Sequence, residues 1–337
     1  MIILIGNFLS KHGLNPTAIE DLYCLLEKRY QVKKASDKKN KLLRLLEMVK
    51  VVTYNRKICK IIIVDVFSTT AFLFFCQIVF LARLFKIPYV PVMRGGDLPK
   101  LLRNKHFLIK LLLTKAHRVI CPSKYLHNFY DGLIEVKVIP NYIDIQKYGF
   151  ILRKRIKPNI LWVRSIHAIY NPMMALKVLQ LIREKYINAR LCFVGPIKDK
   201  KIMNKLQSFI HSNNLIQNVE FSGHLSKKDW INLSLDYDIF INTTNIDNTP
   251  ITLLESMALG LPIVSTDVGG VGNLLENEKT GFLVEKNNSQ AMYSKIDLLL
   301  SDDIVFEKIV KNARQKVLEF DRRVIAEKWY KVIDELY

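Results

Sequence analysis

Short apolar segments rich in β-branched residues alternate with helix-forming segments along the whole chain, and this alternation restricts the possible folds more than any other feature. Alternating strands and helices imply parallel sheets with helices on both faces. The first half is predicted to contain strands at 2–6, 59–67, 89–94, 118–121 and 136–140. The second half is predicted to contain strands at 160–164, 190–195, 219–223, 239–242, 262–266 and 282–284. This is more than one typical sheet holds, so we expect an α/β protein with two Rossmann-like, doubly wound domains.

The length of 337 residues also suits two domains. Segment 142–158 is polar, basic and without a clear pattern, so we interpret it as the linker. The predicted domains are 1–145 and 146–320, followed by a helical segment, 321–337, that is expected to pack back towards the first domain. Because ligands bind beyond the carboxyl ends of parallel strands, two such domains facing each other would form a binding cleft.

Positive charge is concentrated in the first half of the chain. The whole sequence has 51 Lys and Arg against 31 Asp and Glu, a net charge of +20, and residues 1–150 account for +15 of it. Anionic lipid head groups attract such a surface by roughly 1 kcal/mol per nearby Lys or Arg. Nucleic acid would be attracted by the same physics, but the chain lacks basic clusters interleaved with aromatic residues and any recognisable nucleic-acid module. We therefore expect an anionic membrane surface as a partner and no nucleic acid.

Neither a metal site nor a membrane span is predicted. The five cysteines form no Cys-x-x-Cys pair, and the seven histidines show no ligand spacing. The most apolar segment, 71–82, has about 12 residues where a span needs about 20, so we predict a helix buried in an α/β core. The apolar start of the chain resembles a first strand more than a signal peptide, which predicts a cytoplasmic protein.

The stretch 242–270 holds the most informative polar residues. A helix is predicted to begin near Thr249 with Pro250 in its first turn, after the strand at 239–242. Its free N–H groups and positive dipole end suit a diphosphate. Glu255 would reach ribose hydroxyls from within this helix, and Asp247 would reach sugar hydroxyls from the preceding loop. An ordinary capped helix with a solvated Glu255 is the alternative that the pattern leaves open.

This stretch resembles the donor site of retaining glycosyltransferases of family 4, which have the GT-B fold. Asp247 and Glu255 are separated by seven residues, and Glu255 is followed by Ser-Met-Ala-Leu-Gly-Leu-Pro-Ile-Val and then a Gly-Gly turn, as in that family. Four further segments are similar to elements of the family, namely 138–150, 191–195, 219–224 and 280–284.

The resemblance implies a role for each matching residue. Asp247 would contact the donor sugar, Glu255 would bind the ribose, and Arg164 would neutralise the leaving diphosphate, an electrostatic contribution that is usually the largest in catalysis. The remaining donor-binding positions lie around the helix start and at the neighbouring strand ends: Thr249, Pro250, Ile251, Thr252, Gly195, Gly223 and His224. The family retains the anomeric configuration and needs no metal or other cofactor.

Three positions depart from the family pattern. The first acidic residue is Asp247 rather than Glu, and no Lys follows Arg164 before Pro172, so only one positive charge is evident for the diphosphate. Arg94 occupies the place of a His near the reacting sugar, and Arg cannot act as a base near neutral pH, although it can bind a phosphate. Further acceptor-side candidates are in the glycine-containing loops: Gly13, Gly95, Gly96 and Asp97.

Basic amphipathic segments at 37–48 and 101–115 suit a membrane interface, or alternatively solvated helices with one buried face. We therefore expect a metal-independent glycosyltransferase, peripheral at the inner face of the cytoplasmic membrane. It would move a sugar from a nucleotide-sugar donor to a saccharide or polyprenyl-linked acceptor in cell-surface polysaccharide synthesis. The alternatives are a catalytically degenerate relative that binds a partner protein and, less favoured, a nucleotide-sugar epimerase.

Overall fold

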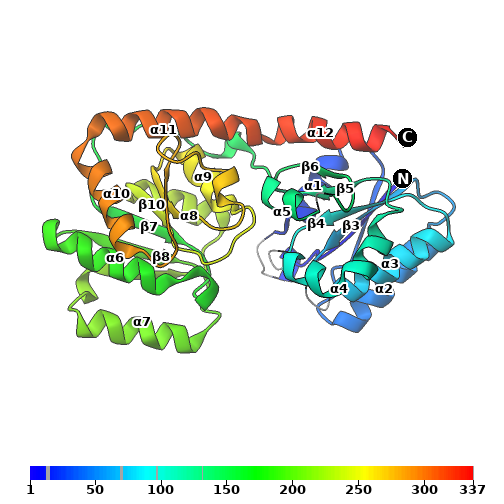
Figure 1. Ribbon diagram of the computed structural model, residues 1–337, viewed down its shortest axis with the longest axis horizontal. Coiled ribbons are helices and arrows are strands. Elements are labelled where there is room, and N and C mark those ends of the chain that lie inside the picture. Colours follow the sequence, from blue (N-terminus) through cyan, green and yellow to red (C-terminus); the bar gives the residue numbers. More distant parts are fainter. Residues whose placement is uncertain (13–15, 69–70, 96–97, 131, 337) are drawn as a thin grey trace. The chain divides into compact units, whose positions relative to one another are not determined.

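The computed structural model describes residues 1–12, 16–68, 71–95, 98–130 and 132–336, with the side chains of 100–106 left aside. The chain forms two compact units. Unit 1 comprises Met1–Asn141 together with Arg322–Tyr337, and unit 2 comprises Tyr142–Asp321 (Figure 1). Both are α/β units built on a six-stranded parallel sheet, as the alternation of segments predicts. The arrangement of the two domains across a cleft remains a prediction.

Unit 1 has the strand order β2-β1-β3-β4-β5-β6. Its strands are β1 (Ile2–Ile5), β2 (Val32–Ala35), β3 (Ile61–Val66), β4 (Tyr89–Met93), β5 (Val119–Cys121) and β6 (Val136–Val138). Its helices are α1 (Ala18–Leu26), α2 (Lys41–Tyr54), α3 (Ala71–Leu84), α4 (Leu98–Leu113), α5 (Lys124–Tyr130) and α12 (Arg322–Asp334). Figure 1 shows α2, α3 and α4 on one face of the sheet and α1 and α12 on the other.

Unit 2 has the strand order β12-β11-β10-β7-β8-β9. Its strands are β7 (Asn159–Val163), β8 (Arg190–Val194), β9 (Val219–Gly223), β10 (Ile239–Asn242), β11 (Ile263–Thr266) and β12 (Phe282–Val284). Its helices are α6 (Pro172–Lys185), α7 (Lys200–Ser212), α8 (Lys227–Leu233), α9 (Ile251–Leu259), α10 (Ser289–Ser301) and α11 (Asp303–Val317). Its hydrophobic core includes the buried Trp162 and Phe193, whose rings meet edge to face at 5.1 Å.

In both sheets the first strand in sequence lies inside the sheet, so the chain winds outward first in one direction and then in the other. The point of reversal lies between β1 and β3 in unit 1 and between β7 and β10 in unit 2. Loops leaving neighbouring strands at such a point diverge to opposite faces, and the resulting crevice is where ligands bind in open α/β sheets. The fold thus marks one candidate location in each unit.

Strand β2 was missed by the sequence analysis. Its sequence is Val-Lys-Lys-Ala, with both lysines exposed and only Ala35 buried. An edge strand buries few side chains, so it lacks the continuous apolar run that identified the other strands.

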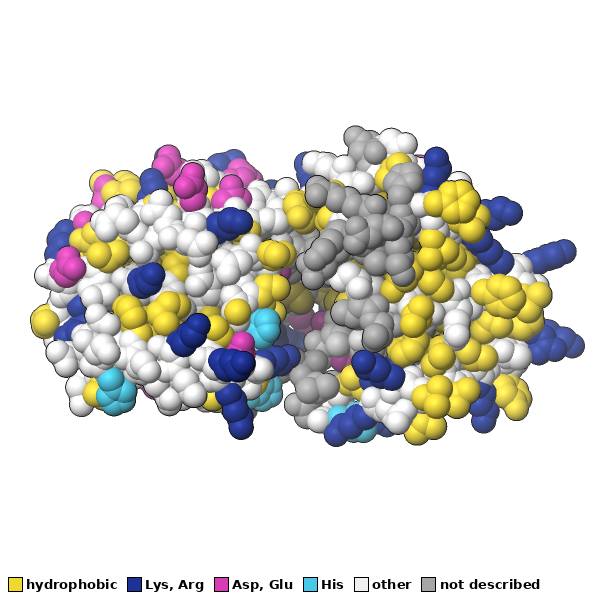
Figure 2. Space-filling view, turned by 60° about the horizontal axis from the view of Figure 1, so that its bottom comes forward, with side chains coloured by type: hydrophobic (Ala, Val, Ile, Leu, Met, Phe, Trp, Pro, Cys, Tyr) yellow, Lys and Arg dark blue, Asp and Glu magenta, His cyan; other side chains and the backbone are white. Residues whose placement is uncertain are grey.

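The apolar segment 71–82 does form a helix, but the prediction that this helix is buried in the core was wrong for one of its faces. Helix α3 buries Phe72, Phe75 and Ile78 against the sheet, but Leu73 and Phe80 remain more than 60% exposed. A helix that lies on a sheet has only one covered face. Figure 2 shows hydrophobic side chains gathered over this surface of unit 1. Among the described residues, no helix is long and apolar enough to cross a bilayer.

The segment 142–158 is an ordered part of unit 2 rather than a free linker. Ile143 N–H donates to Phe320 C=O at 3.1 Å, and Tyr148 is buried. Arg153 donates to the carbonyls of Tyr237 and Gly260 at 2.7 and 3.2 Å. One of the basic residues that suggested a linker, Arg153, is therefore used in hydrogen bonds that hold the segment in unit 2. Helix α12 belongs to unit 1, where Arg29 and Tyr30 donate to Asp334 at 2.9 and 2.6 Å.

Candidate functional site

Two loops meet at the reversal point of unit 2. The loop 164–171 follows β7, and the loop 243–250 follows the neighbouring strand β10. Asn245 N–H donates to Ile169 C=O at 2.8 Å, and Thr243 Oγ1 donates to the carbonyls of Tyr170 and Asn171, each at 2.9 Å. These bonds fix the two loops to each other, so that side chains from both are held at the carboxyl edge of the sheet.

Arg164 and Asp247 form an ion pair in this crevice. Arg164 Nη2 donates to Asp247 Oδ2 at 2.7 Å, and each side chain is 15% exposed. The Arg164 guanidinium also lies over the Tyr170 ring, at 5.3 Å from its centroid. Its Nε atom is buried and has no hydrogen-bond partner among the described residues. The site therefore holds a positioned cation with donor capacity to spare, next to the carboxylate that was expected to contact the donor sugar.

Two glycines bring the backbone close to this pair. Gly195 has φ +146°, and a Cβ added there would lie 2.0 Å from Arg164 O. Gly269 has φ +57°, and a Cβ there would lie 1.9 Å from Asp247 O, which accepts a hydrogen bond from Gly270 N–H at 3.0 Å. Only glycine fits at either position. The Gly-Gly turn noted in the sequence thus supports the Asp247 backbone directly.

We expect Gly195→Ala to lower the free energy of unfolding by at least about 2 kcal/mol, because the new methyl group forces the Arg164 backbone to move. Transferase activity should fall with it. The matched control is Gly149→Ala, since a Cβ at Gly149 meets nothing within 4 Å and its φ is ordinary. That control should change stability by no more than about 0.5 kcal/mol. Denaturant unfolding of both variants tests the difference, and equal losses would contradict it.

Helix α9 starts one to two residues later than predicted. Pro250 is its N-cap, with φ −66° and ψ 111°, so Thr249 and Pro250 precede the helix and Ile251 is its first residue. The extended ψ of Pro250 ends the loop, and its side chain has no oxygen to cap the N–H groups that follow. Thr252 Oγ1 is buried without a hydrogen-bond partner in the described part of the chain. These donors at a helix start form a suitable site for a phosphate group.

Glu255 is buried, which contradicts the alternative of a solvated side chain. It is 1% exposed and accepts a hydrogen bond from Tyr148 Oη at 2.9 Å. Its carboxylate also forms an ion pair with Lys227 Nζ. Glu255 and Tyr148 are buried, whereas the Lys227 side chain is exposed. A buried carboxylate needs such partners to remain charged. Lys227 thus adds a positive charge next to Glu255 that the sequence pattern does not reveal.

The other donor-side candidates lie at the adjoining strand ends. Gly195 follows β8 and donates its N–H to Gly223 O, at the end of β9, at 2.7 Å. His224 comes next in the chain and is exposed. All the predicted donor-side residues of unit 2 thus belong to the carboxyl edge of one sheet, to α9 or to the two residues before it. Tyr148, Tyr170 and Lys227 join them without any spacing pattern that would have identified them.

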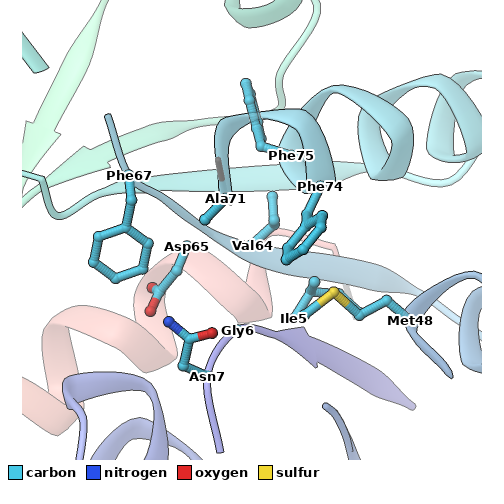
Figure 3. Close-up of a pocket in the computed structure, with 10 residues that line it drawn as sticks. All are labelled: Ile5, Gly6, Asn7, Met48, Val64, Asp65, Phe67, Ala71, Phe74 and Phe75. Atoms are coloured by element: carbon cyan, nitrogen blue, oxygen red, sulfur yellow. The ribbon is translucent and has the colours of Figure 1, made fainter. Parts of the chain in front are cut away.

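The reversal point of unit 1 has a small pocket between the ends of β1 and β3. It has an apolar wall that includes Met48, Phe74 and Phe75, and Figure 3 shows Asp65 and Asn7 facing each other at its polar end. Burial raises the pKa of the Asp65 carboxyl, and the adjacent Arg94 guanidinium opposes that rise.

Arg94 forms two side-chain hydrogen bonds beside this pocket. Its Nε donates to Asp65 Oδ1 at 2.7 Å and its Nη1 to Asn141 Oδ1 at 3.1 Å. Asp65 was not among the candidates, although a carboxylate at the end of an otherwise apolar strand could have drawn attention to it. Gly95 is buried beside Ser68, and its added Cβ would lie 3.0 Å from Ser68 N. Gly13, Gly96 and Asp97 fall outside the described residues.

Among the described residues, no group of three or more His, Cys, Asp and Glu side chains is arranged to hold a metal ion. The cationic groups at the unit 2 site are the guanidinium of Arg164 and the ammonium of Lys227.

The sequence and the fold both match known glycosyltransferases. The chain is 25% identical over 256 residues to an uncharacterised glycosyltransferase of Methanocaldococcus jannaschii, covering 74% of this chain and 68% of the relative. It is also 25% identical to the Escherichia coli UDP-Gal:alpha-D-GlcNAc-diphosphoundecaprenol alpha-1,3-galactosyltransferase, over 60% of this chain and 55% of that enzyme's length.

Among solved structures, Anabaena Alr3699/HepE in complex with UDP superposes with a TM-score of 0.81 at 18% identity, and each chain is fully covered. This likeness shows the fold, which is GT-B. The model of the family described as glycosyl transferases group 1 matches residues 146–316, more than half of the chain, and these residues include Arg164, Asp247 and Glu255. The chain therefore belongs to the glycosyl transferases group 1 and is a glycosyltransferase.

Proposed function

We propose that the protein transfers a sugar from a nucleotide-diphosphate sugar to a lipid-linked saccharide, with retention of anomeric configuration and without a metal ion. The observation that carries this proposal is the Arg164–Asp247 pair at the reversal point of unit 2. Helix α9 begins directly after the loop that holds Asp247. This arrangement offers a cation and N–H donors to a diphosphate and a carboxylate to a sugar.

In the proposed reaction Arg164 stabilises the negative charge that develops on the diphosphate as the glycosidic bond to it breaks. The N–H groups of Ile251 and Thr252 share that charge, since the first turn of a helix leaves them without intrahelical acceptors. Asp247 accepts hydrogen bonds from hydroxyls of the donor sugar, and Glu255 accepts them from the ribose. Fixed donors of this kind take the place of a metal cation in stabilising the leaving group.

Two relatives indicate the class of acceptor. The Escherichia coli relative is named for a diphosphoundecaprenol-linked substrate, and so is a Campylobacter jejuni N-acetylgalactosaminyltransferase that is 30% identical over 111 residues, which is 30% of its length. By extension, we propose a polyprenyl-diphosphate-linked saccharide as acceptor, at the inner face of the cytoplasmic membrane, in cell-surface polysaccharide synthesis.

The test has two stages. A panel of UDP-, GDP- and ADP-sugars is first screened by thermal unfolding, because a ligand that binds only the folded state raises the melting temperature. The donor so identified is then incubated with polyprenyl-diphosphate-linked saccharides, with and without EDTA, and the product's anomeric configuration is read by NMR. We expect transfer with retention in both conditions. A donor that binds without transfer or hydrolysis would instead favour a catalytically inactive relative that binds a partner.

A further inference from the structure

Helices α2, α3 and α4 carry an unusual number of exposed apolar side chains. Leu42 and Leu46 project from α2, Leu73, Phe80 and Leu84 from α3, and Phe107 from α4; we call this surface the apolar face of unit 1. Phe80 is 66% exposed and Phe107 is 80% exposed. Of the large apolar side chains that are exposed among the described residues, more than half lie between 42 and 111. Single exposed apolar residues are normal, whereas a group of them indicates a binding surface.

The three helices form one layer, so these side chains share a surface. Helix α2 packs against α3, and Arg83 of α3 donates to Leu112 C=O, near the end of α4, at 3.2 Å. Leu73, Phe80 and Leu84 are spaced by seven and four residues, which places them in one stripe along α3. Figure 2 shows hydrophobic side chains over this side of unit 1, with Lys and Arg side chains among them and at the rim.

Positive charge strongly predominates in the segment that carries the apolar face. Residues 38–115 include 16 Lys and Arg and only three Asp and Glu. Of those three, Glu47 accepts a hydrogen bond from Ser36, Asp65 is buried in the ion pair with Arg94, and Asp97 is outside the described residues. Lys41, Lys50 and Lys110 are exposed on the helices that carry the apolar face. A partner must therefore accept apolar side chains and present negative charge over the same area.

We propose that the apolar face of unit 1 inserts into an anionic phospholipid bilayer, with the leucines and phenylalanines below the head groups and the lysines at the phosphates. A bilayer surface combines an apolar layer with a negatively charged one at the spacing that a helix side chain spans, and a nucleic acid offers no such apolar layer. The long stems of Lys keep the ammonium groups at the phosphates while the neighbouring side chains are immersed. The inference deepens the proposed function, on which it rests for its biological setting, because a polyprenyl-linked acceptor lies in a membrane.

Flotation of the full chain with vesicles tests the inference. We expect binding to phosphatidylglycerol/phosphatidylcholine vesicles at low salt, weaker binding at high salt, and little binding to phosphatidylcholine alone. The double variant Phe80→Ser/Leu84→Ser should lower the vesicle partition coefficient at least about tenfold, because two large side chains no longer enter the bilayer. Lys41→Ser/Lys110→Ser should lower it by about thirtyfold on anionic vesicles.

Matched controls lie in unit 2. Ile187 and Ile304 are 68% and 81% exposed but belong to other helices and loops, so Ile187→Ser/Ile304→Ser should leave the partition coefficient unchanged. Lys200→Ser/Lys308→Ser removes the same charge from exposed positions outside the face and should have a much smaller effect. Equal losses for face and control variants would overturn the inference. So would a wild-type protein that does not bind anionic vesicles, or an apolar face that proves by analytical ultracentrifugation to join two copies of the chain.

The outcome is separable from that of the proposed function. Nucleotide-sugar hydrolysis, or transfer to a soluble acceptor analogue, depends on the residues of the unit 2 site and should be unchanged in the face variants. Retained chemistry without vesicle binding would contradict the inference alone. Conversely, vesicle binding by a protein without any transfer or hydrolysis would contradict the proposed function alone.

Discussion

Replacing Arg164 with alanine is expected to lower kcat by about a hundredfold to a thousandfold, the usual effect of removing one group that stabilises charge in a transition state. The guanidinium is held by Asp247 at 2.7 Å and by the Tyr170 ring, so it needs little reorganisation when the diphosphate leaves. Arg164→Lys should recover only part of the loss, because a single ammonium cannot reproduce the two-sided donor geometry of a guanidinium. Initial rates at saturating donor measure the effect.

Arg155→Ala is the control for charge removal. Arg155 is exposed and lies within segment 142–158 at the start of unit 2, before β7 rather than after it. Its replacement should leave kcat within about twofold, as expected for a surface substitution away from the site. If Arg164→Ala and Arg155→Ala had the same small effect, the diphosphate would not be bound where we propose. The thermal unfolding of each variant separates a loss of catalysis from a loss of fold.

The second large effect is expected for Glu255→Ala, which should raise the KM for the donor by about tenfold to a hundredfold. A hydrogen bond to a charged group contributes about 1.5–3 kcal/mol, and 1.4 kcal/mol corresponds to a factor of ten. The effect should be on donor binding more than on kcat, because the ribose does not react. The donor concentration dependence of the initial rate measures it, together with the affinity for the nucleoside diphosphate alone.

Tyr148→Phe is the matched variant for Glu255. It removes the 2.9 Å hydrogen bond but keeps the carboxylate and its pairing with Lys227. We expect a rise in donor KM of less than about tenfold, since one neutral donor is lost and Lys227 remains. A Tyr148→Phe variant as impaired as Glu255→Ala would mean that Glu255 acts by holding Tyr148 and its segment in place. In that case the ribose would have to be bound by other groups.

The strands whose apolar runs are buried on both faces could be predicted from the sequence, because parallel central strands such as β3 and β10 consist almost entirely of apolar residues. Edge strand β2 could not, since its two lysines face solvent. The exposed stripe of α3 could not be predicted either. Its sequence is apolar all round, and only the sheet determines which half is covered.

The residues of the candidate site also differ in whether they could be predicted from the sequence. Arg164, Asp247 and Glu255 could be proposed because each lies at a strand end or in the helix that follows one, within stretches that resemble a known family. Tyr148 and Lys227 could not, since their contacts join parts of the chain with no shared spacing. Tyr148 and Glu255, for example, are 107 positions apart. Burial of a carboxylate demands a partner, but the sequence does not say which donor the fold brings to it.

The chain passes from one unit to the other twice, after Asn141 and again before Arg322. Unit 2 is therefore a single uninterrupted stretch, whereas unit 1 is assembled from two stretches separated by 180 residues. Synthesis of residues 1–141 leaves the sheet of unit 1 without α12, whose buried Ile325, Trp329 and Val332 are synthesised only after the whole of unit 2. Completion of unit 1 thus has to wait until residues 322–334 have been synthesised, while unit 2 has all its residues earlier.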